Sequence, residues 1–220
     1  MLDRIQSIFR QQGFRLYTRP YEVNIVGIRS AQTQSNRFDD QIHVFFKTNE
    51  LKWEYHIFKA TTDPGTFWLK NPMSPQGTAI LAQGQYVDAY QIGYHQGKYK
   101  ALVQRGAVTI IRDYDRNAVL DFFNGNRQRG LFGINIHRAF AQGKAKVIDK
   151  FSAGCQVFES AEDFTKLLAM CDKHSGLYGN HFTYTLLDTR AVQRETYRRA
   201  ALGTLAVGLM GLGYYLYTYE

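Results

Sequence analysis

The chain has 220 residues and a formal net charge of +8, with 15 tyrosines, 15 phenylalanines and only 4 prolines. This length and composition exclude an intrinsically disordered chain and favour one globular domain with a sizeable core. The charge suits an acidic partner, such as nucleic acid, anionic lipid or an anionic cell-wall polymer. We nevertheless expect no nucleic-acid partner, because much of the excess charge is local, at Arg190, Arg194, Arg198 and Arg199.

Residues 1–19 begin with an amphipathic pattern in which Leu2, Ile5 and Phe9 recur at helical spacing. They lack the apolar run of a secretory signal, so we expect an N-terminal amphipathic helix. Residues 20–188 predict one catalytic-sized domain of mainly β (α+β) class, because apolar and polar residues alternate in several segments. The expected strands are 23–28, 42–47, 53–60, a short one within 61–69, 84–93, 101–112, 132–137 and 182–187.

A helix is predicted to start at Ser160, whose side chain can cap it together with Asp163. Phe164, Leu167 and Cys171 share its apolar face. We interpret Cys171 as an ordinary core residue, since free cysteine usually packs as a small hydrophobe. Two cysteines in 220 residues do not predict a disulfide framework.

The C-terminal residues predict a membrane anchor. Residues 189–199 form a basic juxtamembrane segment, and residues 200–217 contain no charge and nearly reach the length that spans a bilayer. Near the end of this segment, where an aromatic belt is expected, lie Tyr214, Tyr215, Tyr217 and Tyr219. Ala200, Thr204 and Gly208 form a small-residue stripe that predicts helix–helix association with a membrane partner or a second copy. The alternative is a buried helix of the soluble domain.

The central candidate site is the pair His137 and Cys155. A thiol is a useful nucleophile when a base takes its proton and backbone N–H groups stabilise the oxyanion that forms. His137 is the candidate base and Cys155 the candidate nucleophile. The turn formed by Ser152, Ala153 and Gly154 is expected to direct N–H groups near Gly154 and Cys155 toward the substrate carbonyl, and glycine permits close approach there.

His137 followed by Ser152-x-Gly154-Cys155 resembles the signature of the L,D-transpeptidase (YkuD-type) catalytic domain. Gly133 falls where that family often has a glycine lining the site, and residues 61–67, TTDPGTF, resemble the segment that begins its core. The resemblance covers roughly residues 55–175 and implies a β-sandwich with a few flanking helices. It also implies that Cys155 is the nucleophile, that His137 is the base, and that Ser152 and Gly154 form the oxyanion-side turn.

The chain departs from the family pattern at two points. Ala153 replaces a histidine that supports the site, and Gln156-Val157 replaces an apolar residue followed by Arg or Asn. Gln156 is therefore the candidate polar substitute that rebuilds hydrogen bonding around Cys155. Segments 70–81 and 133–158 also resemble proteins encoded by Bacteroidetes phages.

The resemblance implies a peptidoglycan-active cysteine enzyme that cleaves or transfers stem peptides through an acyl-enzyme, without a cofactor or metal. The alternative is a catalytically inactive, membrane-anchored protein of a virion or envelope that is structural or binds peptidoglycan. The positive-inside rule places the domain in the cytoplasm, away from the cell wall. A phage-encoded lytic or virion-associated protein resolves this conflict, so a virion with an internal membrane or the bacterial envelope is the expected location.

Two weaker patterns remain. Tyr94, His95 and Gln96 form a polar loop that is a candidate cleft lining, although a surface or core role is favoured. Asp113, Asp115, Asn117 and Asp121 occupy positions 1, 3, 5 and 9 of a calcium loop, but Ala118 and Asn124 replace its expected Gly and Glu. A polar hairpin turn is the favoured interpretation.

Overall fold

The computed structural model describes residues 1–198, in two compact units. The larger unit is Leu16–Asp188, and the smaller contains Met1–Arg15 and the chain from Thr189 onward. Within residues 1–198, no helix has the length and apolar character needed to cross a membrane. The predicted anchor at 200–217 lies outside the described residues, as does the last residue of the basic segment 189–199.

The smaller unit consists of two helices in its described part. Helix α1 (Leu2–Gln12) ends at Gly13, which has a left-handed conformation with φ 65°. Residues 189–198 form the second helix. The side-chain amide of Gln11 donates a hydrogen bond of 2.6 Å to Glu195, which joins the two helices. The start of the chain is thus helical, as its apolar spacing predicts.

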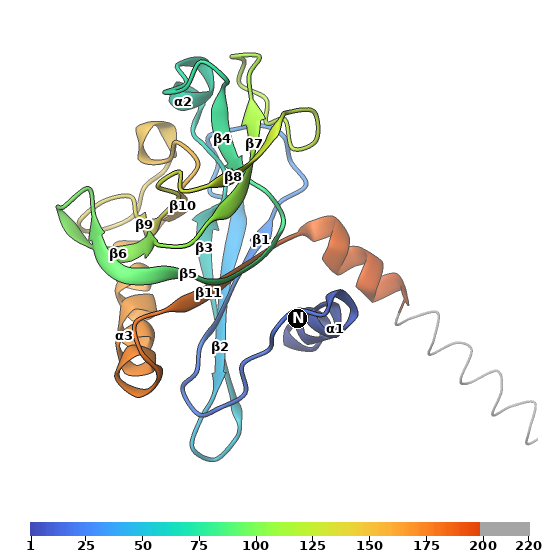
Figure 1. Ribbon diagram of the computed structural model, residues 1–220, viewed down its shortest axis with the longest axis vertical. Coiled ribbons are helices and arrows are strands. Elements are labelled where there is room, and N and C mark those ends of the chain that lie inside the picture. Colours follow the sequence, from blue (N-terminus) through green and yellow to red (C-terminus); the bar gives the residue numbers. More distant parts are fainter. Residues whose placement is uncertain (199–220) are drawn as a thin grey trace, which may run out of the picture. The chain divides into compact units, whose positions relative to one another are not determined.

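The larger unit is built around an eight-stranded sheet that closes into a barrel (Figure 1). The strand order is β1-β11-β5-β6-β9-β10-β3-β2, and β2 pairs again with β1. These strands are β1 (Asn24–Arg29), β2 (Asp40–Lys47), β3 (Trp53–Thr61), β5 (Gly84–His95), β6 (Tyr99–Gln104), β9 (Ile136–Arg138), β10 (Gln156–Phe158) and β11 (Phe182–Asp188).

The expected β-sandwich is wrong, because this sheet closes into a barrel. Strand β1 pairs with β2 on one side and, in parallel, with β11 on the other, so all six of its residues are buried. The interior is filled by large side chains such as Tyr90, Phe158 and Tyr184. The chain is a mixed α+β protein, and the pairing of β1 with β11 joins segments about 160 residues apart, which local alternation does not reveal.

A second sheet of three strands, in the order β4-β7-β8, lies at one end of the closed sheet (Figure 1). Its strands are β4 (Thr78–Leu81), β7 (Val108–Asp113) and β8 (Arg127–Gly130). The predicted single strand 101–112 is therefore divided between the two sheets. The extended conformation is interrupted at Arg105 and Gly106, whose N–H groups both donate to the carbonyl of Ala89.

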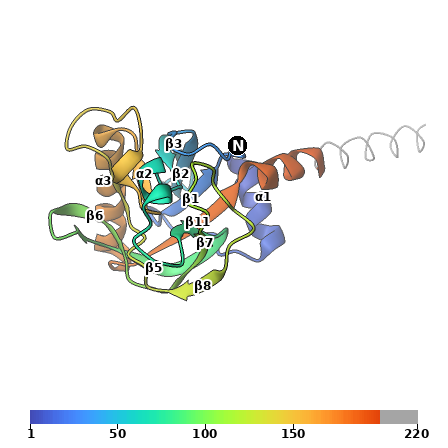
Figure 2. The same ribbon diagram turned by 90° about the horizontal axis from the view of Figure 1, so that it is seen from above.

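Three helical elements complete the larger unit. Helix α2 (Thr66–Lys70) occupies the position where another short strand was expected, so that expectation is wrong. A 3-10 turn covers Asp149–Phe151, and α3 (Ala161–Tyr178) contacts β9 and β10. Ser160 caps α3 by accepting the N–H of Asp163, as predicted, and Cys171 is fully buried. Figure 2 looks onto the end that carries α2 and β7.

Candidate active site

His137 and Cys155 come from two neighbouring parallel strands. His137 lies in β9, opposite Val157 of β10, and Cys155 immediately precedes β10. Because side chains alternate along a strand, Cys155 and Val157 point to the same side of the sheet, as does His137. The strand spacing places the two Cα atoms on a diagonal of about 8 Å. Both side chains lie outside the barrel interior, which is filled from these strands by Ile136 and Phe158.

The imidazole of His137 is held in one tautomer. Its Nδ1–H donates to the carbonyl of Arg138 at 2.8 Å, and the Tyr99 hydroxyl lies 3.1 Å from the same nitrogen. Since a carbonyl only accepts, Nδ1 carries the proton and Nε2 carries the lone pair. Among the described residues, Nε2 is buried and has no hydrogen-bond partner. Burial lowers the pKa of His137 to about 3, so the imidazole is neutral at physiological pH.

His95 stacks on this imidazole. The two ring centroids are 4.1 Å apart, and Nδ1 of His95 lies 3.0 Å from the side-chain amide of Asn135. Of the polar loop singled out in the sequence, the structure therefore brings His95 to the candidate site, whereas Tyr94 remains 69% exposed. Tyr99 is a further neighbour that the sequence pattern did not indicate. Its hydroxyl also lies 3.2 Å from the carbonyl of Arg138.

The thiol of Cys155 has two backbone partners. It lies 3.5 Å from the carbonyl of Gly133, and the N–H of Asn135 donates to Sγ at 3.4 Å. Burial raises the pKa of the thiol to about 11, and the Asn135 N–H opposes that rise. No hydrogen bond joins Cys155 to His137 within residues 1–198. The resting pair is thus a neutral thiol and a neutral imidazole.

The turn before Cys155 is fixed by Ser152. The Ser152 hydroxyl accepts the N–H of Gly154 at 3.1 Å and donates to the carbonyl of Cys155 at 2.8 Å. The N–H of Gly154 is therefore already engaged, and it must leave Ser152 before it can serve an oxyanion. The carbonyl of Ser152 accepts the N–H of Gly65, which links the turn to the segment after β3.

Gln156 supports the same turn from inside the barrel. Its side-chain amide donates to the carbonyl of Gly154 at 3.2 Å, and its oxygen accepts the hydroxyl of Tyr184 at 2.9 Å. Gln156 and Cys155 are consecutive, so their side chains leave the strand on opposite sides. Gln156 hence acts on the backbone of the turn, and it does not contact the thiol.

A small pocket of about 110 Å³ opens beside Ala153. Arg112 contributes the positive charge of this pocket. Its Nη1 donates to the carbonyl of Gly77 and its Nε to Gln128, while Nη2 has no protein partner among residues 1–198. The remaining lining comes from Trp68, Met73, Ser74, Gly77, Thr78, Ala79 and Phe132.

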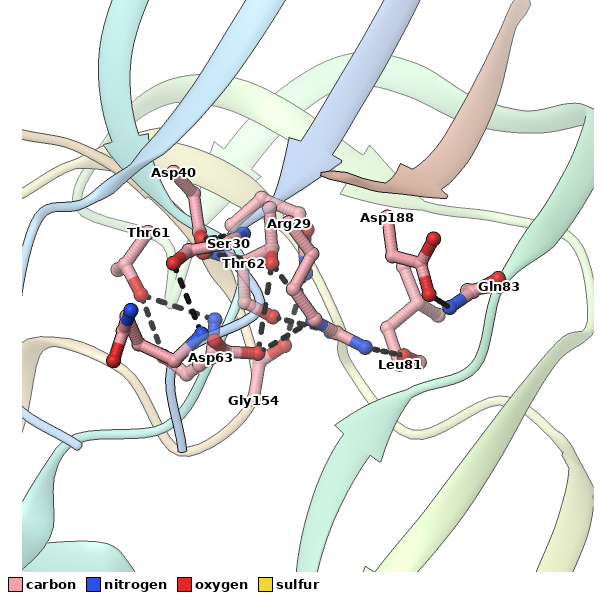
Figure 3. Close-up of polar contacts among 12 residues, drawn as sticks. Arg29, Ser30, Asp40, Thr61, Thr62, Asp63, Leu81, Gln83, Gly154 and Asp188 are labelled. Carbon is pink, nitrogen blue, oxygen red and sulfur yellow. Dashed lines mark hydrogen bonds and ion pairs between the residues drawn. The ribbon is translucent and has the colours of Figure 1, made fainter. Parts of the chain in front are cut away.

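A buried ion network lies behind the turn and was missed in the sequence (Figure 3). Arg29 pairs with Asp63 at 2.7 Å, and its guanidinium donates to the carbonyls of Leu81 and Thr62. Asp40 accepts the N–H groups of Ser30 and Thr62. Burial, together with the nearby Asp63 carboxylate, raises the pKa of Asp40 to about 8. The Arg29 guanidinium thus forms an ion pair with Asp63, and its positive charge also opposes the rise in the pKa of Asp40.

The sequence contained one signal for this network, namely the TTDPG segment that carries Thr62 and Asp63. Its partners Arg29 and Asp40 stand at the ends of β1 and β2, and the antiparallel pairing of β1 with β2 and of β2 with β3 brings them to this segment. The network anchors the segment whose Gly65 holds Ser152. It is therefore connected to the turn that carries Cys155.

Comparisons with known proteins found no matching family model, no similar curated protein and no similar solved structure. The likeness to L,D-transpeptidases consequently rests on the spacing of His137, Ser152, Gly154 and Cys155 and on the segments around them.

The two cysteines are expected to differ sharply in reactivity. In the folded protein, iodoacetamide should label Cys155 about tenfold faster for each pH unit between roughly 7 and 10, because only the thiolate reacts and its pKa is near 11. Cys171 should stay unlabelled until the protein unfolds, since it is fully buried. Peptide mapping by mass spectrometry measures both. A Cys155 rate that levels off below pH 8 would contradict the raised pKa.

Gly154 is expected to tolerate no side chain. Its φ is 121°, and a Cβ placed on it would lie 2.3 Å from the carbonyl oxygen of Ala79. Gly154→Ala should lower the free energy of unfolding by about 2 kcal/mol, measured by denaturant titration. Gly97→Ala is the matched control, because Gly97 also has positive φ but has open space around it. Equal losses of stability in both variants would contradict the explanation that a Cβ on Gly154 clashes with the Ala79 carbonyl.

Proposed function

We propose that the chain is a cysteine acyl-transfer enzyme, with Cys155 as nucleophile and His137 as general base. The observation that carries this proposal is the state of His137. Its Nδ1–H is fixed by the Arg138 carbonyl, which leaves a buried Nε2, without a hydrogen-bond partner among the described residues, on the same side of the sheet as the thiol. A buried nitrogen without a partner costs stability, and such costs concentrate at functional sites.

The reaction begins from the neutral pair. As Sγ of Cys155 bonds to an amide carbon, the thiol proton passes to Nε2 of His137, and the carbonyl oxygen becomes an oxyanion. Collapse of this intermediate breaks the C–N bond, and Nε2 returns the proton to the leaving amine. Water or a second amine then attacks the thioester and gives its proton to Nε2; the C–S bond breaks, and Nε2 returns the proton to Sγ, which restores the neutral thiol of Cys155.

The proposed substrate is a peptidoglycan stem peptide, the substrate that the L,D-transpeptidase resemblance implies. One observation supports a ligand with carboxylates. Arg112 lines the pocket beside Ala153, and its Nη2 has no hydrogen-bond partner among residues 1–198. A phage-encoded lytic or virion-associated role in the bacterial envelope fits this substrate. Hydrolysis and transpeptidation differ only in the acceptor that attacks the thioester.

A second candidate is a non-catalytic protein that binds peptidoglycan or has a structural role. The raised pKa of Cys155, near 11, and the missing hydrogen bond between Cys155 and His137 favour this candidate. A thiol that is protonated at neutral pH must lose its proton during attack, which makes catalysis depend entirely on the base.

Purified muropeptides distinguish the two functions. The full chain is incubated with them, and mass spectrometry follows the loss of D-Ala or the formation of cross-links. The wild type should produce one of these changes, whereas Cys155→Ala should not. Cys171→Ala is the matched control, since it removes the other buried thiol. Identical spectra for wild type and Cys155→Ala would remove the enzymatic proposal, and retention on isolated cell walls would then support the binding protein.

A further inference from the structure

The loop between β7 and β8 gathers three carboxylates at the end of the three-stranded sheet. Asp113 is the last residue of β7, and the N–H of Arg112 beside it bonds to the carbonyl of Asn126, which closes the base of the loop. Ligand oxygens from Asp113, Asp115 and Asp121 lie within 4.8 Å of one another. The calcium-loop spacing noted in the sequence is therefore realised in space by three of its four residues.

The carboxylate of Asp113 supplies independent evidence for a ligand. The residue is only 1% exposed, and its Oδ1 has no hydrogen-bond partner among the described residues. Its other oxygen, Oδ2, accepts the N–H of Asp121 at 3.0 Å. A buried carboxylate oxygen without a donor is costly. A cation bound at Oδ1 would remove that cost.

The charges around Asp113 are also those of an incomplete site. A structural role for Asp113 alone would be served by a lysine or arginine facing it. The groups whose oxygens lie within 4.8 Å of its carboxylate are instead two further carboxylates, those of Asp115 and Asp121.

We infer that Asp113, Asp115 and Asp121 bind a calcium ion. Oxygens that bind Ca²⁺ lie about 2.3–2.6 Å from it, so ligands within 4.8 Å of one another fit around one ion. Asp115 is exposed and Asp121 half-buried, which leaves room for water to complete the six to eight ligands that Ca²⁺ takes.

Asn117 contributes to the shape of the loop and not to the ion. Its side-chain oxygen accepts the N–H of Val119 at 2.5 Å, and its amide donates to Asp115. The preference for a plain hairpin turn, drawn from the sequence, is revised because the sequence does not show that Asp113 is buried. This site is independent of the proposed acyl-transfer activity.

Thermal unfolding of the full chain, first stripped of metal with a chelator, tests the site with CaCl₂ alone as the probe. Ca²⁺ at about tenfold its dissociation constant should raise the melting temperature by roughly 3–6 °C. Asp115→Asn and Asp121→Asn should each lose most of this shift. Glu50→Gln is the matched control, because it removes one carboxylate from a different, exposed turn, and it should keep the full shift.

Asp113→Asn provides a second readout with the opposite sign. Without Ca²⁺ it should melt at a higher temperature than the wild type, because it removes a buried charge that has no cation, and it should not respond to Ca²⁺. Titration of Tb³⁺ luminescence should show one site in the wild type and none in Asp113→Asn. An unchanged melting temperature in millimolar Ca²⁺, or a full shift retained in Asp115→Asn and Asp121→Asn, would overturn the inference.

Discussion

Arg29→Ala is expected to lower the free energy of unfolding by about 3–5 kcal/mol, which is a large part of the stability of an ordinary domain. The substitution removes the ion-pair partner of Asp63 and leaves that buried carboxylate without its countercharge, and it removes the positive charge that opposes the raised pKa of Asp40. It also leaves the carbonyls of Leu81 and Thr62 without their donors. Guanidinium denaturation at neutral pH measures the loss.

The same variant has a diagnostic pH dependence. Without Arg29, folding must bury a carboxylate that the unfolded chain keeps hydrated, so the pKa of Asp63 rises further in the folded state. A raised pKa gives stability that is present at low pH and lost as pH rises. The deficit of Arg29→Ala should therefore shrink as the pH is lowered toward 4, where the buried carboxyl groups hold their protons.

Two further variants separate charge from packing. Arg105→Ala removes a guanidinium from an exposed position and should change stability by less than about 0.5 kcal/mol. Adding Asp63→Asn to Arg29→Ala removes the carboxylate that has lost its countercharge and should recover part of the loss. A loss below about 1 kcal/mol in Arg29→Ala, or no recovery in the double variant, would contradict the role given to this network.

Local patterns predicted several of the individual elements. The strands expected at 42–47, 53–60 and 182–187 correspond to β2, β3 and β11, each within two residues at either end. The helix that begins after Ser160 is also confirmed, because its cap and its apolar face are properties of a few neighbouring residues. Alternation and capping are local, so one sequence is enough to detect them.

Closure of the sheet could not be predicted in the same way. The parallel pairings of β1 with β11 and of β9 with β10 are set by packing between distant segments. Strand β9 has only three residues, so its pattern is too short to show which neighbour it takes. The sandwich was expected from a family resemblance, and the strands alone do not exclude a closed arrangement.

The candidate site shows the same division between local and distant information. The hydroxyl of Ser152 bonds within its own turn, and Gly154 meets the backbone of Ala79, so both residues fix the shape of the turn, whereas the motif indicated an oxyanion role. The positions of Tyr99 and His95 beside His137 depend on the pairing of β6 with β9 and were not predictable from spacing.

His137→Phe is expected to abolish most catalysis and leave the fold intact. Removing a general base typically costs about 10²–10⁴-fold in rate, and within residues 1–198 the hydrogen-bond partners of the neutral thiol are backbone groups, not a second base. The ring stacks on His95 and is buried, which a phenyl ring can reproduce. The hydrogen bond from Nδ1 is lost, but so is the unpartnered Nε2, and the Tyr99 hydroxyl still reaches the Arg138 carbonyl. Stability should therefore change by only about 1 kcal/mol.

Acid titration gives a second signature of the same variant. The pKa of His137 is about 3 in the folded chain against 6.5 in an unfolded one. A lowered pKa gives stability that is present above 6.5 and lost as pH falls toward 3. His137→Phe should accordingly lose less stability than the wild type over that range. His43, whose pKa burial lowers to about 4, should keep part of the slope in both proteins.

His174→Phe is the control that isolates chemistry from burial. His174 on α3 also has a buried Nε2 without a partner among the described residues, and it stacks near Phe182, away from Cys155. Its Nδ1 accepts the N–H of Val23, so replacing it costs stability, yet the rate of muropeptide turnover should be unchanged. If His137→Phe keeps the wild-type rate while Cys155→Ala does not, another group deprotonates the thiol, and the role of His137 falls.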